Sequence, residues 1–319
     1  MPCLRTTSAA IRAVYAASRL LLSISIVVLG MLACSPSSPE EETINWQMYS
    51  ADASGSKYTR ARQINKKNVS QLQPAWVLET GDHRTAPRST IQCNPIIVDS
   101  IVYLTTPGLK VLAVHGVTGE EVWRFDPYEG VPASGVNRGL SYWTDGNEKR
   151  LLYVAGSLLY ALNAETGEAI KSFGKQGTVD LYEGLGRPVD FMWVTAATPG
   201  IVFEDMIIMG TTLGEGPSPA APGHIRAYDV RTGVMRWIFH TIPQPDEFGY
   251  ETWSPNSWQE LGGANAWGGF TLDPERAMVF CGTGSSTYDH WGGNRIGKNL
   301  FANCILALNA RTGEIVWHY

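Results

Sequence analysis

The chain has 319 residues, of which 44% are apolar and 17% are charged, so it is long enough to bury a large core. Its net charge of −5 excludes the basic balance that is typical of nucleic-acid-binding proteins. With 33 Gly, 11 Trp and 13 Tyr, the composition favours a β-rich, turn-rich fold over a helical bundle.

Residues 1–34 have the pattern of an export signal. Arginines precede an apolar run over residues 20–33, which is too short to span a bilayer comfortably and ends in small residues. Cys34 follows at once, and Met31-Leu32-Ala33-Cys34 resembles the cleavage box of bacterial lipoproteins. We therefore expect a bacterial, periplasmic protein held to a membrane by a lipid on Cys34. An ordinary cleaved signal with an incidental cysteine is the alternative.

Residues 35–44, which begin SPSSPEEE, are polar and rich in proline and glutamate, so we expect an unfolded tether there. Beyond it, Cys93, Cys281 and Cys304 are widely spaced, and the chain has no CxxC, CxxCH or HExxH motif. We expect these three cysteines to be buried apolar thiols.

An eleven-residue pattern then occurs four times. It begins with Ala, has Thr-Gly at its sixth and seventh places and ends with Trp, except that the second copy ends with Lys171. The copies are AVHGVTGEEVW at 113–123, ALNAETGEAIK at 161–171, AYDVRTGVMRW at 227–237 and ALNARTGEIVW at 307–317. Each copy follows the apolar pattern of one strand, turns at Thr-Gly and enters a second strand, which predicts a β-hairpin.

A single hairpin cannot bury its Trp, but a neighbouring copy can cover it, because the small Ala of one sheet leaves room for the indole of the next. Stacked repeats of this length predict a β-propeller of four-stranded blades. The motif glycines at 119, 167, 233 and 313 are 48, 66 and 80 residues apart, so the later blades carry insertions, which usually gather on a functional face. Trp76, in LQPAWVLETG, is interpreted as the end of an earlier blade.

This arrangement resembles the propeller of the pyrroloquinoline quinone (PQQ) dehydrogenases, whose blades carry the same Ala…Thr-Gly…Trp motif. The resemblance covers about Trp46 to Tyr319. It implies an all-β, eight-bladed ring, of which residues 45–319 would supply about half, as the N-terminal part of a longer protein truncated at its C-terminus. Non-enzymatic propellers, including the lipoprotein scaffold of outer-membrane protein assembly, use the same motif, so a protein-binding scaffold is the alternative.

Two segments between the repeats also resemble cofactor-binding segments of this family. In GVNRGLSYW, residues 135–143, Arg138 takes the place of the family's Arg near the quinone, and a guanidinium suits the carboxylates of PQQ. In GGANAWGGFTLDP, residues 262–274, Trp267 takes the place of the Trp that stacks on the quinone, and Asn265 that of a hydrogen-bonding residue. The alternatives are a surface arginine in a turn and one more docking tryptophan.

The segment GTGSSTYDHWGGNR, residues 282–295, resembles the glucose-oxidising branch, whose corresponding Asp is the catalytic base, so the resemblance assigns that role to Asp289. In the alcohol-oxidising branch the base lies in a Gly-Asp-Asn. This chain has Lys298 there, and Ser285 stands in place of that branch's metal-binding Asn. These departures favour the glucose type and leave open a decayed enzyme that keeps the ring without the activity.

Three further residues match family positions. In GTTLGEG, residues 210–216, Thr212 resembles a cofactor-contacting residue and Glu215 a metal ligand. Gln92 stands where relatives often have Glu, and its amide can hydrogen-bond a quinone oxygen. Loop residues of these types are also often simply solvated.

The resemblance thus implies oxidation of a glucose-type aldose or another alcohol. Asp289 would take the proton and PQQ the hydride, while Ca²⁺ or Mg²⁺, held by Glu215 and Asp289, would polarise the quinone. Electrons would then pass to membrane quinone or to a haem protein such as a cytochrome.

Overall fold

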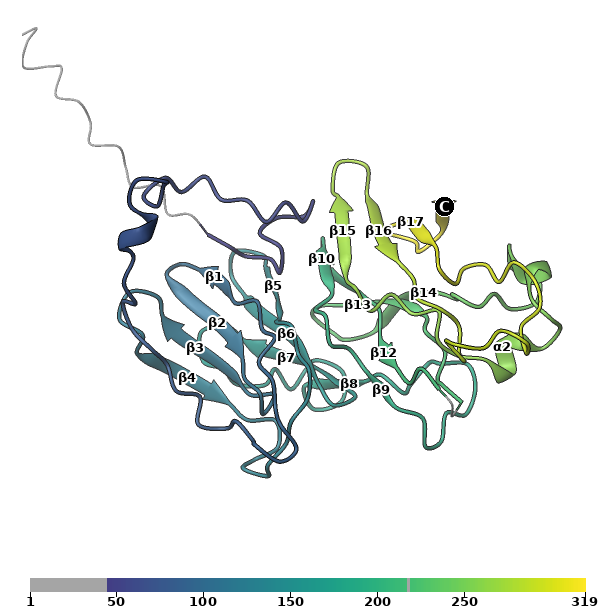
Figure 1. The fold of residues 1–319 in the computed structure, drawn as a ribbon, viewed down its shortest axis with the longest axis horizontal. Helices are drawn as coiled ribbons and strands as arrows, with labels where there is room; N and C mark the ends of the chain where they lie inside the picture. Colours follow the sequence, from purple (N-terminus) through teal and green to yellow (C-terminus); the bar gives the residue numbers. More distant parts are fainter. Residues whose placement is uncertain (1–44, 217–218) are drawn as a thin grey trace, which may run out of the picture. The chain divides into compact units, whose positions relative to one another are not determined.

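The computed structural model describes residues 45–216 and 219–319. These residues contain four antiparallel sheets of four strands each (Figure 1). The first sheet contains β1 (Ile96–Val98), β2 (Ile101–Thr105), β3 (Val111–His115) and β4 (Glu121–Phe125). The second contains β5 (Ser141–Thr144), β6 (Lys149–Ala155), β7 (Leu158–Asn163) and β8 (Thr178–Asp180). The third contains β10 (Ile201–Phe203), β11 (Met206–Met209), β13 (Ile225–Asp229) and β14 (Met235–Phe239). The fourth contains β15 (Phe270–Asp273), β16 (Met278–Gly282), β17 (Ile305–Asn309) and β18 (Ile315–His318).

The remaining elements are short. A two-stranded ladder pairs β9 (Val194–Thr195) with β12 (Thr212–Leu213). The described helical turns are η1 (Val69–Gln71), η2 (Tyr250–Thr252) and α2 (Ser257–Glu260), and none of them is long and apolar enough to cross a membrane. The predicted signal and tether lie outside the described residues.

Each sheet follows chain order, so each is a simple meander, and the prediction of four-stranded propeller blades is confirmed. The third sheet leaves out β12, which lies in the insertion between β11 and β13. Central strands such as β13 are buried along their whole length, whereas β4 is mostly exposed. Each apolar core is shared by two successive sheets. Val111 of the first sheet packs in one cluster with Leu151 of the second, Leu152 of the second with Ile207 of the third, and Ile208 of the third with Leu306 of the fourth.

The predicted tryptophan docking is present for the first and third copies of the motif, whereas Trp317, which ends the fourth copy, is 43% exposed. Trp123 donates its indole N–H to the Ala164 carbonyl of the next sheet at 3.0 Å. Its ring covers Gly167, where an added Cβ would lie 2.4 Å from the indole, so only glycine fits. Trp237 likewise donates to the Ala310 carbonyl at 3.1 Å. The repeat therefore works as a joint between neighbouring blades.

Trp76 docks in the same way. Its indole donates to the Gly116 carbonyl at 3.0 Å and covers Gly119, yet the residues around it form no strand in the described part of the chain. The docking agrees with the interpretation of this segment as the end of an earlier blade, which stays an interpretation.

The second copy departs from the predicted hairpin. After its turn, a single bridge between Leu162 and Ala169 replaces the second strand, and β8 pairs with β7 instead. Lys171 is exposed, while Phe173 is fully buried in the core between the second and third sheets. Because a lysine offers little apolar surface to bury, the anchor moves to Phe173 and the hairpin strand is lost.

Candidate functional site

A pocket of about 400 Å³ opens among the loops that enter and leave the four sheets, and a volume of this size is typical of a small-molecule site. Segments preceding β1, β5 and β15, the β11–β13 insertion and the β16–β17 loop all contribute to it. The structure brings all seven predicted site residues together as lining of this pocket: Gln92, Arg138, Thr212, Glu215, Asn265, Trp267 and Asp289.

Backbone hydrogen bonds tie the pocket segments to one another. The Arg138 N–H donates to the Ala197 carbonyl at 2.7 Å, and the Asn94 N–H donates to the Arg138 carbonyl at 2.9 Å. The Ala197 N–H in turn donates to the Thr212 hydroxyl at 3.2 Å. The loop that carries Gln92 is thereby linked through Arg138 to the ladder of β9 and β12.

Arg138 and Trp267 form one corner of the pocket. The guanidinium carbon lies 5.7 Å from the centroid of the indole, within the range of a cation–π contact. The indole is 50% exposed, whereas the docked Trp237 is 8% exposed. Trp267 is therefore not buried between blades, and its ring is available to a ligand.

The glycines before Trp267 let its segment pass tightly between two others. An added Cβ at Gly262 would lie 2.0 Å from the Ala220 carbonyl oxygen. Gly263 has a φ of +74° and forms bridges with Pro222 and Ser286. The pairing holds the floor of the pocket in one position.

Arg187 supports the same floor from outside the pocket. Its side chain donates to the Ala220 carbonyl at 3.0 Å and to the Leu261 carbonyl at 2.9 Å. The Asn265 amide nitrogen donates to the Thr211 carbonyl at 2.7 Å, which orients that side chain.

Two carboxylates, those of Glu215 and Asp289, also line the pocket. The Asp289 N–H donates to the Glu215 carbonyl at 3.2 Å. Burial and the negative charge of Glu215 raise the pKa of Asp289 above its ordinary value, against the positive charges of His290 and Arg295. A raised pKa is typical of a carboxylate that works as a base.

The described residues contain no group of three or more His, Cys, Asp or Glu side chains close enough to hold a metal ion. The two carboxylates are nevertheless hard oxygen donors of the kind that Ca²⁺ and Mg²⁺ prefer, and a ligand's own oxygens can complete such a shell. The donor set therefore fits a hard cation bound together with an anionic cofactor.

Sequence reasoning missed part of the lining. Trp193 and Tyr128 face the pocket although they lie outside every motif, and Thr195 lies beside them. Ser285, which the sequence marks only as a departure, also lines it, whereas Lys298 is exposed and absent from the lining. The residues after Trp193, VTAATPG, carry no pattern that marks a site.

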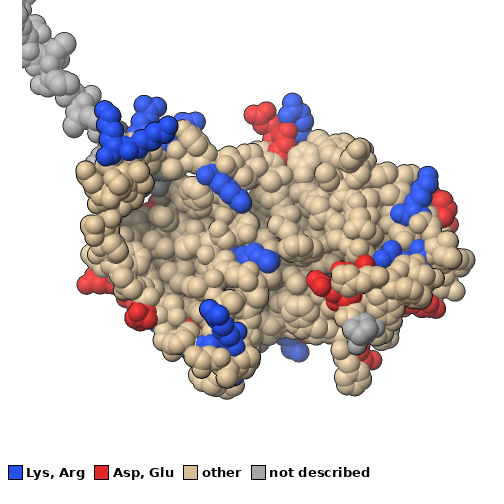
Figure 2. Space-filling view, in the orientation of Figure 1, with Lys and Arg blue, Asp and Glu red and all other residues tan. Residues whose placement is uncertain are grey.

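Two of the predicted thiols fit the expectation. Cys281 and Cys304 are buried and free, whereas Cys93 is only half-buried. On the face shown in Figure 2, Lys and Arg gather mainly at one corner and the rest is sparsely charged.

Comparison with known proteins agrees with this geometry. Residues 46–319 match the family described as "PQQ: Glucose/ethanol/alcohol dehydrogenase, beta-propeller domain". The quinate/shikimate dehydrogenase (quinone) of Acinetobacter baylyi is 31% identical over 89% of this chain and 38% of its own length. The quinoprotein glucose dehydrogenase A of Acinetobacter calcoaceticus is 32% identical over 86% of this chain and 37% of its own length.

Among solved structures, the quinohemoprotein alcohol dehydrogenase of Comamonas testosteroni superposes with a TM-score of 0.69 at 27% identity, covering 87% of this chain and 41% of that one. The chain thus spans less than half the length of the relatives that it matches. The repeat, the pocket and these matches agree, and the chain belongs to the family of PQQ-dependent glucose, ethanol and alcohol dehydrogenases, of whose β-propeller domain it forms part.

Proposed function

We propose that the protein binds PQQ in this pocket and serves the oxidation of a CH–OH group in a glucose-type aldose or another alcohol. The single observation that carries the proposal is the meeting of seven residues, drawn from loops of all four sheets, around one cavity. A random set of loop residues would be scattered over the surface.

The pocket fits the cofactor chemically. PQQ is a flat ortho-quinone with three carboxylates, and the pocket offers a half-exposed indole with a guanidinium beside it. Glu215 and Asp289 would hold Ca²⁺ or Mg²⁺ in the same pocket. When bound, PQQ and its cation supply the electrophilic centre that accepts the hydride.

Asp289 is the proposed base that accepts the substrate hydroxyl proton. It lines the pocket, and its raised pKa makes it a stronger base than an ordinary aspartate. Lys298, at the place of the alcohol-branch base, is exposed outside the lining, which supports the glucose type.

The setting is part of the proposal. A lipid on Cys34 would hold the protein at a membrane surface in the periplasm, and electrons would leave to membrane quinone or to a haem protein. The relatives include a quinate/shikimate dehydrogenase (quinone) and a quinohemoprotein alcohol dehydrogenase, whose names support either acceptor.

Dye reduction tests the proposal directly. The protein is assayed with glucose and with ethanol, each with and without PQQ and Ca²⁺. We expect reduction that requires PQQ and is greater with glucose, and a loss of at least about a hundredfold in Asp289→Asn, because removing a general base costs on the order of 10²–10⁴. If neither substrate class supports PQQ-dependent reduction, the proposal is wrong.

A pH titration of the cation-free protein adds a second check. Followed by NMR, the Asp289 carboxyl should lose its proton at a higher pH than an ordinary aspartate, because burial and the negative charge of Glu215 raise its pKa. Replacing Glu215 with Gln removes that negative charge, so the transition should move to lower pH. A transition that stays in place would contradict the coupling of the two carboxylates.

A further inference from the structure

We propose that Thr198 is a positioning residue that fixes the Arg138 guanidinium beside the ring of Trp267 before the cofactor arrives. The inference rests on the proposed function and deepens it, because it says how the binding corner of the pocket is prepared.

The Thr198 hydroxyl links the Arg138 side chain to the backbone of Trp267. It accepts a hydrogen bond from the Arg138 guanidinium (Nη1) at 3.1 Å and donates one to the Trp267 carbonyl at 2.7 Å. A hydroxyl has a single proton to donate. Because the hydroxyl donates its proton to the Trp267 carbonyl, its oxygen lone pairs accept from the Arg138 guanidinium. The two bonds together fix the orientation of the hydroxyl.

The threonine itself is immobilised. Thr198 is 8% exposed, and an added Cβ at Gly269 would lie 3.0 Å from its methyl group, so the methyl packs closely on that turn. The β-branched side chain has few rotamers available. The neighbouring Ala197 holds both the backbone of Arg138 and the hydroxyl of Thr212.

The link matters because the Arg138–Trp267 contact is near its limit. At 5.7 Å, the guanidinium carbon stands close to the outer bound of about 6 Å for cation–π attraction. An arginine without this tether would sample several rotamers and lose that freedom when it binds a carboxylate. Thr198 removes this cost in advance, which is preorganisation.

The test uses two variants that separate the hydroxyl from the methyl. Thr198→Val keeps the branched shape and removes both hydrogen bonds, whereas Thr198→Ser keeps the hydroxyl. Thr241→Val is the matched control, because Thr241 is fully buried and its hydroxyl has no partner among the described residues.

PQQ is titrated into each protein with Ca²⁺ present, and tryptophan fluorescence is followed. We expect Thr198→Val to weaken PQQ binding about tenfold, as the loss of one hydrogen bond to a charged group implies, while Thr198→Ser and Thr241→Val stay within about threefold of the wild type. Adding Thr198→Val to Arg138→Met should cause no further loss. Equal binding in Thr198→Val and wild type, or a full additional loss in the double variant, would overturn the inference.

A second readout does not use the cofactor. The thermal midpoints of wild type, Thr198→Val, Arg138→Met and the double variant form a cycle, and we expect the two shifts not to add, because both changes break one contact. If wild-type protein does not bind PQQ, the proposed function fails, and this cycle alone then decides whether Thr198 positions Arg138. Additive shifts would show that it does not.

Discussion

In two of the joints between neighbouring blades, a backbone carbonyl of one blade accepts a hydrogen bond from a side chain of the preceding blade, but the donor side chain differs. Where the second blade receives the first, the carbonyl three residues after the motif alanine accepts the indole N–H of Trp123. The corresponding carbonyl of the third blade belongs to Val230, and the preceding copy has Lys171 in place of the Trp. Arg150, from β6, donates to Val230 at 3.1 Å and to the Arg231 carbonyl at 2.9 Å.

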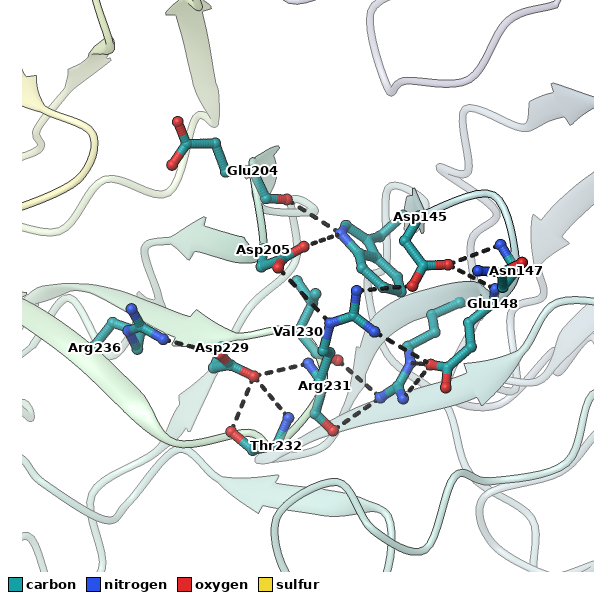
Figure 3. Close-up of polar contacts among 12 residues, drawn as sticks. Asp145, Asn147, Glu148, Glu204, Asp205, Asp229, Val230, Arg231, Thr232 and Arg236 are labelled. Atoms are coloured by element: carbon teal, nitrogen blue, oxygen red, sulfur yellow. Dashed lines mark hydrogen bonds and ion pairs between the residues drawn. The ribbon is translucent and has the colours of Figure 1, made fainter.

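Figure 3 shows the polar network that surrounds this second joint. The indole of Trp143 donates to the Glu204 carbonyl at 3.1 Å, and the Arg231 guanidinium lies 4.5 Å from the centroid of its ring. Glu148 pairs with Arg150 at 2.6 Å, and Asp145 pairs with Arg231 at 2.8 Å.

The difference between the tryptophan joint and the arginine joint indicates what the Trp of the motif provides. A buried carbonyl needs a donor in either joint. A tryptophan supplies both the N–H donor and apolar surface, so the tryptophan joint needs no charged partner. An arginine supplies a donor and a charge, and the charge requires acidic partners, so the second joint is a network and should depend on salt and pH.

The largest effect should follow Arg150→Leu. Arg150 is 5% exposed, and its loss leaves two carbonyls without the donor that it supplies and Glu148 with Arg231 as its remaining cation. We expect the free energy of unfolding to fall by about 4 kcal/mol, because each of the two acceptors left without this donor costs about 1–3 kcal/mol. Urea denaturation measures it, and a change below about 1 kcal/mol would show that the arginine does not hold the joint.

A somewhat smaller loss is expected from Gly167→Ala in the tryptophan joint. The added Cβ would overlap the Trp123 ring, and the φ of +75° disfavours alanine, so we expect a cost of about 3 kcal/mol. Gly146→Ala is the control, since Gly146 also has a positive φ but has nothing within 4 Å of an added Cβ. It should lose about 1 kcal/mol. In a Trp123→Ala background the clash vanishes, so Gly167→Ala should then cost as little as the control.

Trp123→Phe should cost less again, about 1–2 kcal/mol, because the ring remains and the donor to Ala164 is lost. Raising NaCl from 0.05 to about 0.5 M should leave this cost unchanged, since the lost bond is between neutral groups. A salt-dependent cost would mean that charge also acts in this joint. Chemical denaturation at the two salt concentrations provides the comparison.

The smallest expected effect is on the stability of the protein at low pH. Hydrogen bonds from the Glu148 backbone and from Arg231 lower the pKa of the exposed Asp145 well below its usual value. A lowered pKa contributes stability above the ordinary aspartate pKa, and that stability is lost as pH falls toward the folded value. The thermal midpoint of Asp145→Asn should therefore fall less than that of wild type between pH 5 and about 2. Parallel curves would contradict this.

The sequence predicts the repeated part of the fold well, because the Thr-Gly turn and its Trp act locally and through one neighbour. It does not predict the joint at Val230. Lys171 signals that a tryptophan is missing, but no local pattern shows that Arg150, on a strand of the preceding blade, takes over its donor role.

The candidate site shows the same division. Residues in distinctive glycine-rich segments, such as Arg138 and Trp267, could be found from sequence and meet in the pocket. Thr198 and Trp193 could not, because their importance arises only from chain segments that the fold brings together. Pairwise contacts between distant loops leave no periodic trace in a single sequence.

The most direct test of the account is a calorimetric titration of the protein with PQQ in the presence of Ca²⁺. We expect saturable binding at one site, and we expect Trp267→Ala to weaken it at least about tenfold, as the loss of a stacking ring implies. Trp317→Ala, which alters a 43% exposed indole outside the pocket, should bind as wild type does. Heats that do not saturate, or equal affinity in Trp267→Ala and wild type, would contradict the assignment of this pocket to the quinone.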